Sequence, residues 1–179
     1  LMDYARAHPD KLSYASAGIG AISHLAGELF KSEAQAEITH VPYKGGGAAM
    51  PDLMSGQVQL MLETIPNTLS ALRAGKLRAL AISSDTRSAS LPDVPTFKEA
   101  GLSKLNVTTW TGLFGPADVS TRLNAELVKI LADADYVKRI EQTGSVVPKP
   151  MTGEQFSAFV SSEVTRWRAV AQAAGVQPE

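Results

Sequence analysis

The chain has 179 residues, 44% of them hydrophobic and 20% charged, with a formal net charge of -1 and no cysteine. This length suits one α/β domain, or one domain with part of another, and the near-neutral charge gives no reason to expect nucleic acid or an acidic membrane surface as a partner. The absence of cysteine excludes disulfides, thiolate metal sites and thiol nucleophiles, and no apolar run approaches the roughly 20 residues of a membrane-spanning helix.

Short apolar runs alternate with helix-like segments through the first two thirds of the chain. The runs are almost wholly apolar rather than alternating, as expected of a mainly parallel sheet with helices on both faces. Gly56 and Gly75 each follow an expected helix, where glycine tolerates a left-handed turn. The sequence therefore predicts an α/β fold of βαβ units, with strands at 12–16, 38–42, 58–62 and 77–83 and helices at 22–32, 48–55 and 66–74.

The last third of the chain has a different character. Residues 106–116, NVTTWTGLFGP, are rich in β-branched and aromatic residues and indicate a strand or a crossover. Beyond Pro116, apolar residues recur at helical spacing in two stretches, and Thr152 with Gln155 fits a capping box at the start of the second. We expect two amphipathic helices joined by GSVVPKP, each with an apolar face that must pack on something.

The segment SAGIGAISH, residues 16–24, places glycines and small residues between the first expected strand and helix. Backbone N–H groups at such a turn bind anionic oxygens. A dinucleotide motif is incomplete, because Ser23 replaces its third glycine and no acid ends the second strand. A Walker lysine is absent, and Tyr14 stands where a nucleophile elbow has glycine. A merely structural turn and an anion site of amides with the Ser16 and Ser23 hydroxyls both stay open.

Two further loops follow the second and third expected strands, where α/β sheets usually bind ligands. Tyr43 and Lys44 precede three glycines that allow close backbone approach; the alternative is an exposed loop with a solvated lysine. Glu63 and Asn67 follow the third strand; the alternative for this loop is helix capping by Thr64 or Asn67.

The three histidines, His8, His24 and His40, lack the spacing of a metal site. No nucleophile with a paired base and no pair of carboxylates can be assembled. The residues therefore favour binding over catalysis, with no metal or cofactor.

Three blocks of the sequence resemble signature blocks of Bug-type receptors, the extracytoplasmic solute-binding proteins of tripartite tricarboxylate transporters. They are residues 11–34, 38–84 and 90–102, in the order and spacing of that family, and the similarity continues to the end of the chain. The resemblance implies a two-lobed periplasmic-binding-protein fold that closes on a small carboxylate, which is an organic acid, an acidic amino acid or an aromatic acid. It implies a periplasmic receptor with no catalytic activity, monomeric when intact, with the transporter's membrane subunits as partners.

The resemblance also implies where the ligand binds. In the family, one glycine-rich loop from each lobe holds a ligand carboxylate, mainly through main-chain amides. The second of these loops matches residues 16–24, and the loops at 43–47 and 63–67 would line the cleft. The predicted ligand-binding residues are Ser16, Ala17, Gly18, Ile19, Gly20, Ala21, Ser23, His24, Tyr43, Lys44, Gly45, Glu63 and Asn67.

The family's first lobe opens with its own strand, glycine-rich loop and helix, which have no counterpart here. We therefore expect a C-terminal fragment without signal peptide or first lobe. Residues 1–113 would form the second lobe, and residues 114–179 the crossover and the helices that belong with the first lobe. The exposed helix faces would then allow self-association. Two other classes stay open: a ligand-sensing effector domain of a transcription regulator, and an enzyme that uses the glycine loop as an oxyanion site with His24 as base.

Overall fold

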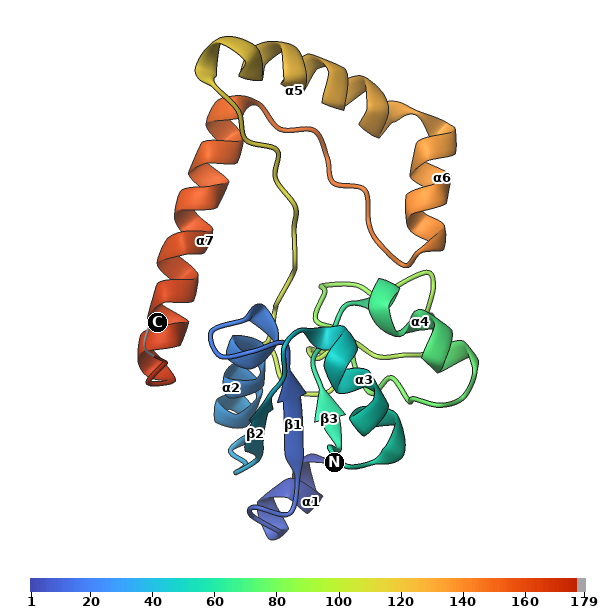
Figure 1. Ribbon diagram of the computed structural model, residues 1–179, viewed down its shortest axis with the longest axis vertical. Coiled ribbons are helices and arrows are strands. Elements are labelled where there is room, and N and C mark those ends of the chain that lie inside the picture. The colour runs from blue at the N-terminus through green and yellow to red at the C-terminus, as the bar shows by residue number, and fades with distance from the viewer. Residues whose placement is uncertain (177–179) are drawn as a thin grey trace.

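A computed structural model describes residues 1–176, so the last three residues of the expected C-terminal unit lie outside the described residues. The α/β fold with a parallel sheet is confirmed (Figure 1). The elements in chain order are α1 (Met2–Ala7), β1 (Ser13–Ser16), α2 (Ile22–Ala34), β2 (Thr39–Pro42), α3 (Gly46–Ser55), β3 (Leu60–Met61), α4 (Ile65–Arg73), α5 (Ala117–Ala132), α6 (Ala134–Gln142) and α7 (Gly153–Ala173). None of these helices is long and apolar enough to cross a membrane.

β1 is the central strand of a three-stranded parallel sheet of order β2-β1-β3. Tyr14 on β1 pairs with His40 on β2 and with Leu60 on β3. Each crossover passes through a helix, as parallel pairing requires. Because the strands are parallel, their carboxyl ends meet at one edge of the sheet, and the loops that follow them gather there (Figure 1).

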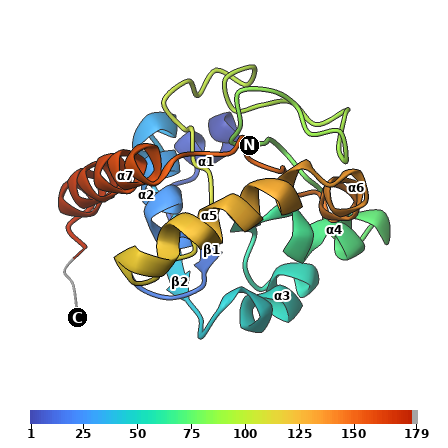
Figure 2. The same ribbon diagram turned by 90° about the horizontal axis from the view of Figure 1, so that it is seen from above.

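Helices cover both faces of the sheet, as the apolar runs predict. Successive residues of β1 point to opposite faces. Tyr14 lies in a core with Phe30 of α2, whereas Ala15 lies in a second core with Ala49 of α3 and Val58. Figure 2 shows α2 and α3 on either side of β1. β1 is therefore buried on both faces, which explains its lack of polar alternation.

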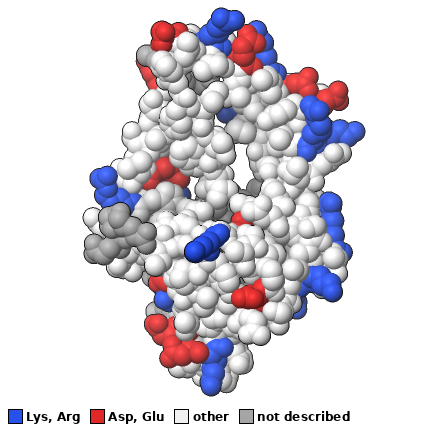
Figure 3. Space-filling model, in the orientation of Figure 1, with Lys and Arg blue, Asp and Glu red and all other residues white. Residues whose placement is uncertain are grey.

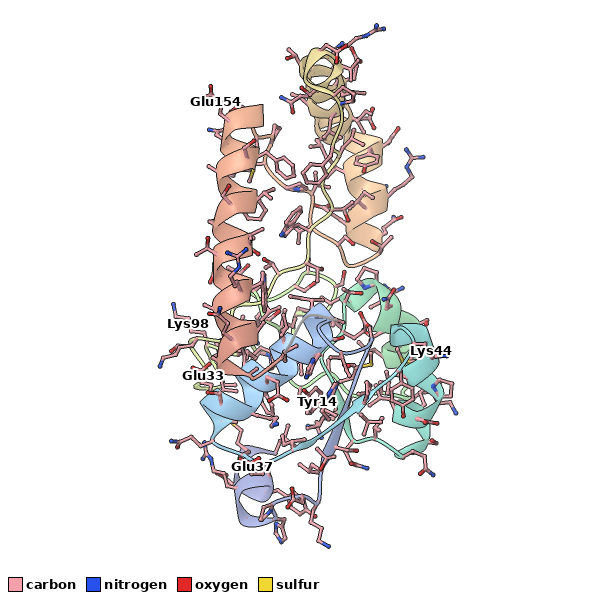
Figure 4. The ribbon with its side chains drawn as sticks, turned by 60° about the vertical axis from the view of Figure 1, so that its left-hand side comes forward. Tyr14, Glu33, Glu37, Lys44, Lys98 and Glu154 are labelled. Atoms are coloured by element: carbon pink, nitrogen blue, oxygen red, sulfur yellow. The ribbon has the colours of Figure 1, made fainter. Side chains whose placement is uncertain are left out.

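Tyr14 is wedged directly against the backbone of α2. A β-carbon added to Gly27 would lie 2.1 Å from Cε2 of the Tyr14 ring. The Tyr14 hydroxyl donates to Oε1 of Glu28 at 2.7 Å, and Lys31 donates to the same carboxylate at 3.0 Å. Burial, with the Glu28 hydrogen bond second, raises the pKa of Tyr14. The ring is thus closely packed with its polar atom satisfied (Figure 4).

The predicted strand at 77–83 is wrong. Within the described residues this segment makes a single parallel bridge, between Ile82 and Thr96. Ile82 donates to the Pro95 carbonyl at 2.9 Å, and Phe97 donates to the Ile82 carbonyl at 2.9 Å. Proline has no N–H to donate, so Pro92 and Pro95 prevent this pairing from extending into a ladder.

Residues 106–116 form no strand and run as an extended connection from the sheet to α5, which is the crossover alternative (Figure 1). The prediction of two helices beyond Pro116 is wrong, because the described residues form three. The first predicted helix breaks at Asp133, whose backbone is extended and whose Oδ1 accepts from the Tyr136 amide at 2.7 Å. This cap begins α6. The capping box of Thr152 and Gln155 at the start of α7 is confirmed.

Helices α5, α6 and α7 form an arch above the carboxyl edge of the sheet (Figure 1). α7 returns alongside α2, and Arg166 donates to the carbonyl of Asn106. Figure 3 shows an opening through the arch, and both signs of charge are interspersed on that face. Large apolar side chains are exposed in the connection that leads into α5, with Leu113 at 61% and Phe114 at 68% of their full exposure, and on α5 itself, with Val119 at 41%. The arch therefore presents apolar surface to solvent.

We predict that Gly27→Ala destabilises the protein by about 1–3 kcal/mol, because the new methyl overlaps the Tyr14 ring and a packed core resists added volume. Urea unfolding monitored by circular dichroism measures this change. Gly153→Ala is the matched control, since a β-carbon there meets no atom within 4 Å. Equal stability of the two variants would contradict the close packing of Tyr14 on α2.

Candidate functional site

The structure brings the three predicted loops together at the carboxyl edge of the sheet. The Tyr43 amide donates to the Ser16 carbonyl at 3.0 Å, and the Gly45 amide donates to the Ala17 carbonyl at 3.1 Å. These bonds join the loops after β1 and β2. The third loop is adjacent, because the Glu63 carboxylate lies against Gly46.

The loop after β1, residues 17–21, is held by its own hydrogen bonds. The Ala17 amide donates to Ser23 Oγ at 2.9 Å and the Gly18 amide to Ser16 Oγ at 3.2 Å. The Gly20 amide donates to Nδ1 of His24 at 3.0 Å, and the Ala21 amide donates to the Gly18 carbonyl at 3.2 Å. Four amides of the predicted anion site therefore shape the loop instead of facing a ligand.

Three other amides are available at the same place. Within the part of the chain that the structure describes, the N–H groups of Ile19, Ile22 and Ser23 have no hydrogen-bond acceptor. Ile22 and Ser23 are the first two residues of α2, whose N–H groups have no partner inside the helix. The helix macrodipole adds partial positive charge there. The loop thus offers a neutral group of donors at its apex and at the start of α2.

The loop after β3 lies next to the start of α3, as the loop after β1 lies next to the start of α2. Glu63 Oε1 accepts from the Thr64 amide at 2.7 Å and from Nδ2 of Asn67 at 3.2 Å. A β-carbon on Gly46 would lie 2.1 Å from Glu63 Oε2, so the carboxylate reaches the first residue of α3. The Glu63 carboxylate thus lies against the start of α3, whereas no such side chain is described at the start of α2. Glu63 and Asn67 lie beside the loops but bond to each other.

The loop after β2 contributes an aromatic residue and a cation. The Tyr43 hydroxyl donates to Asp52 at 2.7 Å, and this hydrogen bond raises the pKa of Tyr43. The ring packs on the core beneath α3, so the side chain mainly supports the loop. Lys44 is exposed and lies beside α3 (Figure 4). Gly45, at φ +102, precedes α3 with a backbone that favours glycine.

A residue that the sequence reasoning missed, His40, lies directly below the glycine loop. Its Nε2 is 2.6 Å from Ser16 Oγ, and its ring stacks on that of His24 with centroids 3.9 Å apart. Burial and the neighbouring His24 lower the pKa of His40 to about 4. Only the parallel pairing of β1 with β2 reveals that His40 lies beside Ser16, since these two residues are far apart in sequence.

The contact between Ser16 and His40 is not a catalytic dyad. Ser16 has no exposed surface, and its hydroxyl oxygen already accepts from the Gly18 amide. Nδ1 of His24 accepts from the Gly20 amide, and Oγ of Ser23 accepts from the Ala17 amide. A nucleophile and its base must be able to reach a substrate. The predicted hydroxyls and His24 are therefore committed to the loop, and the arrangement is suited to binding a carboxylate.

Residues 1–176 contain no group of three His, Asp or Glu side chains close enough to hold a metal ion. The donor set of the loop, which consists of N–H groups, also suits an anion rather than a cation.

Comparison with known proteins identifies related sequences. Residues 1–176 match a family model described as tripartite tricarboxylate transporter family receptor. The UPF0065 protein in the tcbD-tcbE intergenic region of Pseudomonas sp. (strain P51) is 39% identical over 173 residues, covering 94% of this chain and 51% of that protein. Protein BugT of Bordetella pertussis is 32% identical over 181 residues, covering 99% of this chain and 55% of BugT.

Solved structures agree with this relationship. R. palustris Rpa4515 with adipate has a TM-score of 0.87 and 31% identity, covering 99% of this chain and 60% of that one. MatC (Rpa3494) from Rhodopseudomonas palustris with bound malate has a TM-score of 0.83 and 35% identity, covering 94% of this chain and 60% of that one. The chain spans about half the length of the curated relatives it matches. The family consists of receptors, not enzymes.

We predict that acidification destabilises the fold through His40. The pKa of His40 is about 4 in the folded chain and near 6.5 when unfolded, so below pH 6.5 the unfolded chain binds a proton that the folded chain does not. The free energy of unfolding should therefore fall from about pH 6.5 to about pH 4, by roughly 1–2 kcal/mol after allowance for partial exposure.

Urea unfolding of wild type and His40→Gln across this range measures the effect. The variant should lose less stability on acidification, because glutamine does not titrate. His8→Asn, which changes an exposed histidine at the C-cap of α1, should follow wild type. Parallel loss in wild type and His40→Gln would show that His40 is not the group responsible.

Proposed function

We propose, because the chain belongs to the tripartite tricarboxylate transporter receptor family, that it carries a carboxylate-binding loop of an extracytoplasmic solute receptor. The observation that carries the proposal is the loop at residues 17–21, in which four amides are bonded within the protein, together with three amides that stay open among the described residues, those of Ile19 in the loop and of Ile22 and Ser23 in α2. The solved relatives that hold adipate and malate support a small organic acid as the ligand. The proposal also includes acidic amino acids and aromatic acids, which carry the same carboxylate group.

In this proposal one ligand carboxylate accepts hydrogen bonds from the amides of Ile19, Ile22 and Ser23. A hydrogen bond to a charged group is worth about 1.5–3 kcal/mol, and the macrodipole of α2 adds attraction. Lys44 supplies a positive charge nearby. The other predicted residues support the loop from within or border it, namely Ser16, Ala17, Gly18, Gly20, Ala21, His24, Tyr43, Gly45, Glu63 and Asn67.

The role of the whole receptor is also a proposal, since the chain spans about half the length of its curated relatives. We propose that residues 1–113 act as one lobe of a two-lobed trap and that a second lobe closes over the ligand. The arch would pack with that second lobe. The complete receptor would work in the periplasm as a monomer and deliver its ligand to the membrane subunits of a tripartite transporter.

Calorimetric titration with adipate and malate tests the binding proposal. Ile22→Pro removes one open amide at little structural cost, because proline is favoured at the first position of a helix and Ala21 already has φ -63 and ψ 156. We expect this variant to bind about tenfold more weakly than Ile22→Ala, which loses the side chain but keeps the amide.

Equal affinity of the two variants would exclude the Ile22 amide as a ligand contact. Absence of binding by both the 179-residue chain and the complete gene product would contradict the proposed function.

We further predict that the 179-residue chain self-associates through an apolar surface of the connection at 106–116 and of α5, defined by the exposed side chains of Trp110, Leu113, Phe114, Val119 and Leu123. Exposed apolar patches of this kind favour association. Sedimentation velocity should show mass rising with concentration, and Leu113→Ser with Phe114→Ser should suppress it. Val146→Ser changes an exposed apolar residue outside the surface and is the control. Concentration-independent monomers of wild type would refute the prediction.

A further inference from the structure

Two histidine rings stack beneath the glycine loop. The rings of His24, on α2, and His40, on β2, are nearly parallel, at 7°, with centroids 3.9 Å apart. The Tyr14 ring stacks against His40 at 4.9 Å and 23°. The three rings therefore form a layer between the core and the loop, built from three different elements of the fold.

Each histidine holds one glycine of the loop. Nδ1 of His24 accepts from the Gly20 amide at 3.0 Å. Nε2 of His40 lies 2.6 Å from Ser16 Oγ, which accepts from the Gly18 amide at 3.2 Å. Gly18 and Gly20 have φ values of +135 and +74, which only glycine adopts readily. The peptide that carries the open Ile19 amide is thus anchored on both sides through an imidazole.

Tyr14 and His24 of this layer are buried, whereas His40 is partly exposed. His24 is 7% exposed and Ser16 is fully buried, whereas Ile19 is 57% exposed. The histidines therefore act on the ligand through the backbone that they hold.

We propose that His24 and His40 act together as positioning residues for the loop at 17–21, and that charging both rings releases Gly20, loosens the loop and weakens ligand binding. The part that concerns ligand affinity rests on the proposed function; the part that concerns the loop does not.

The surroundings of the pair support this mechanism. Nδ1 of His24 cannot accept the Gly20 N–H once it carries a proton, and two imidazolium rings at 3.9 Å repel each other. Tyr14 of β1 and Glu28 and Lys31 of α2 are the other titratable groups around the rings. Glu28 is already bonded to Tyr14 and Lys31, so its charge is shared among several partners. On α7, which packs against α2, Glu163 and Arg166 pair with each other.

Nitrogen-15 NMR of the ligand-free 179-residue chain tests the loop part. From about pH 7.5 to about pH 3.5, a range that includes the His40 pKa of about 4, the Gly18 and Gly20 amides should shift with the same midpoints as the two histidine rings. In His24→Asn, Oδ1 takes the place of Nδ1, so Gly20 keeps an acceptor and should stop following pH. His8→Asn should leave both glycine titrations unchanged. Titrating rings with pH-independent glycine amides would overturn the proposal.

Adipate affinity tests the ligand part. The double variant His24→Asn with His40→Gln keeps both hydrogen bonds but has no imidazole, and ligand protonation affects it and wild type equally. On acidification to about pH 4, where His40 also titrates, wild type should lose about fivefold more affinity than the double variant, as expected for one lost hydrogen bond. His40→Phe keeps the stacked ring without the Ser16 contact and should bind more weakly at every pH.

The outcomes separate the two proposals. If wild type gains affinity on acidification relative to the double variant, attraction by the imidazolium dominates and the positioning role is wrong. If adipate and malate fail to bind to any variant while the glycine amides follow the rings, the proposed function is wrong and the positioning of the loop stands.

Discussion

The parallel pairing of β1 with β2 and β3 is the constraint on which the rest of the structure depends. It brings the carboxyl ends of three strands to one edge, so that three loops from separate parts of the chain become neighbours. The same register places Tyr14 opposite His40 and leaves Ser16 within hydrogen-bond distance of that ring. The edge that bears the candidate site and the layer that supports it are thus consequences of one pairing.

The two helices that begin at this edge differ in how their N-termini are used. At α3 the Glu63 carboxylate lies against the first residue and bonds to the Thr64 amide. At α2 the amides of Ile22 and Ser23 stay open among the described residues, while Ser23 Oγ and Nδ1 of His24 turn back to hold the loop. A loop that satisfies its own polar groups is pre-organised, which lowers the entropy that a ligand must remove on binding.

Local sequence patterns correctly predicted where several helices begin and end. Gly56, with φ +80, ends α3, and Thr152 with Gln155 caps α7, both at the positions that turn and cap chemistry indicates. Tertiary context overrode the pattern elsewhere. The apolar run at 77–83 lies beside a segment that contains Pro92 and Pro95, and it forms only one bridge with that segment among the described residues. Apolar residues recur at helical spacing on both sides of Asp133, which predicts one helix. The side chain of Asp133 instead caps a new helix, α6.

The sequence by itself determined the α/β class, the family, the first three strands with the helices between them and the glycine loop as the candidate site, because hydrophobic period, turn residues and motif spacing are all local properties. The tertiary structure decided which amides stay open, that Glu63 lies against the start of α3 and that His40 lies beneath Ser16. These depend on contacts between residues distant along the chain, and the register of the strands sets those contacts.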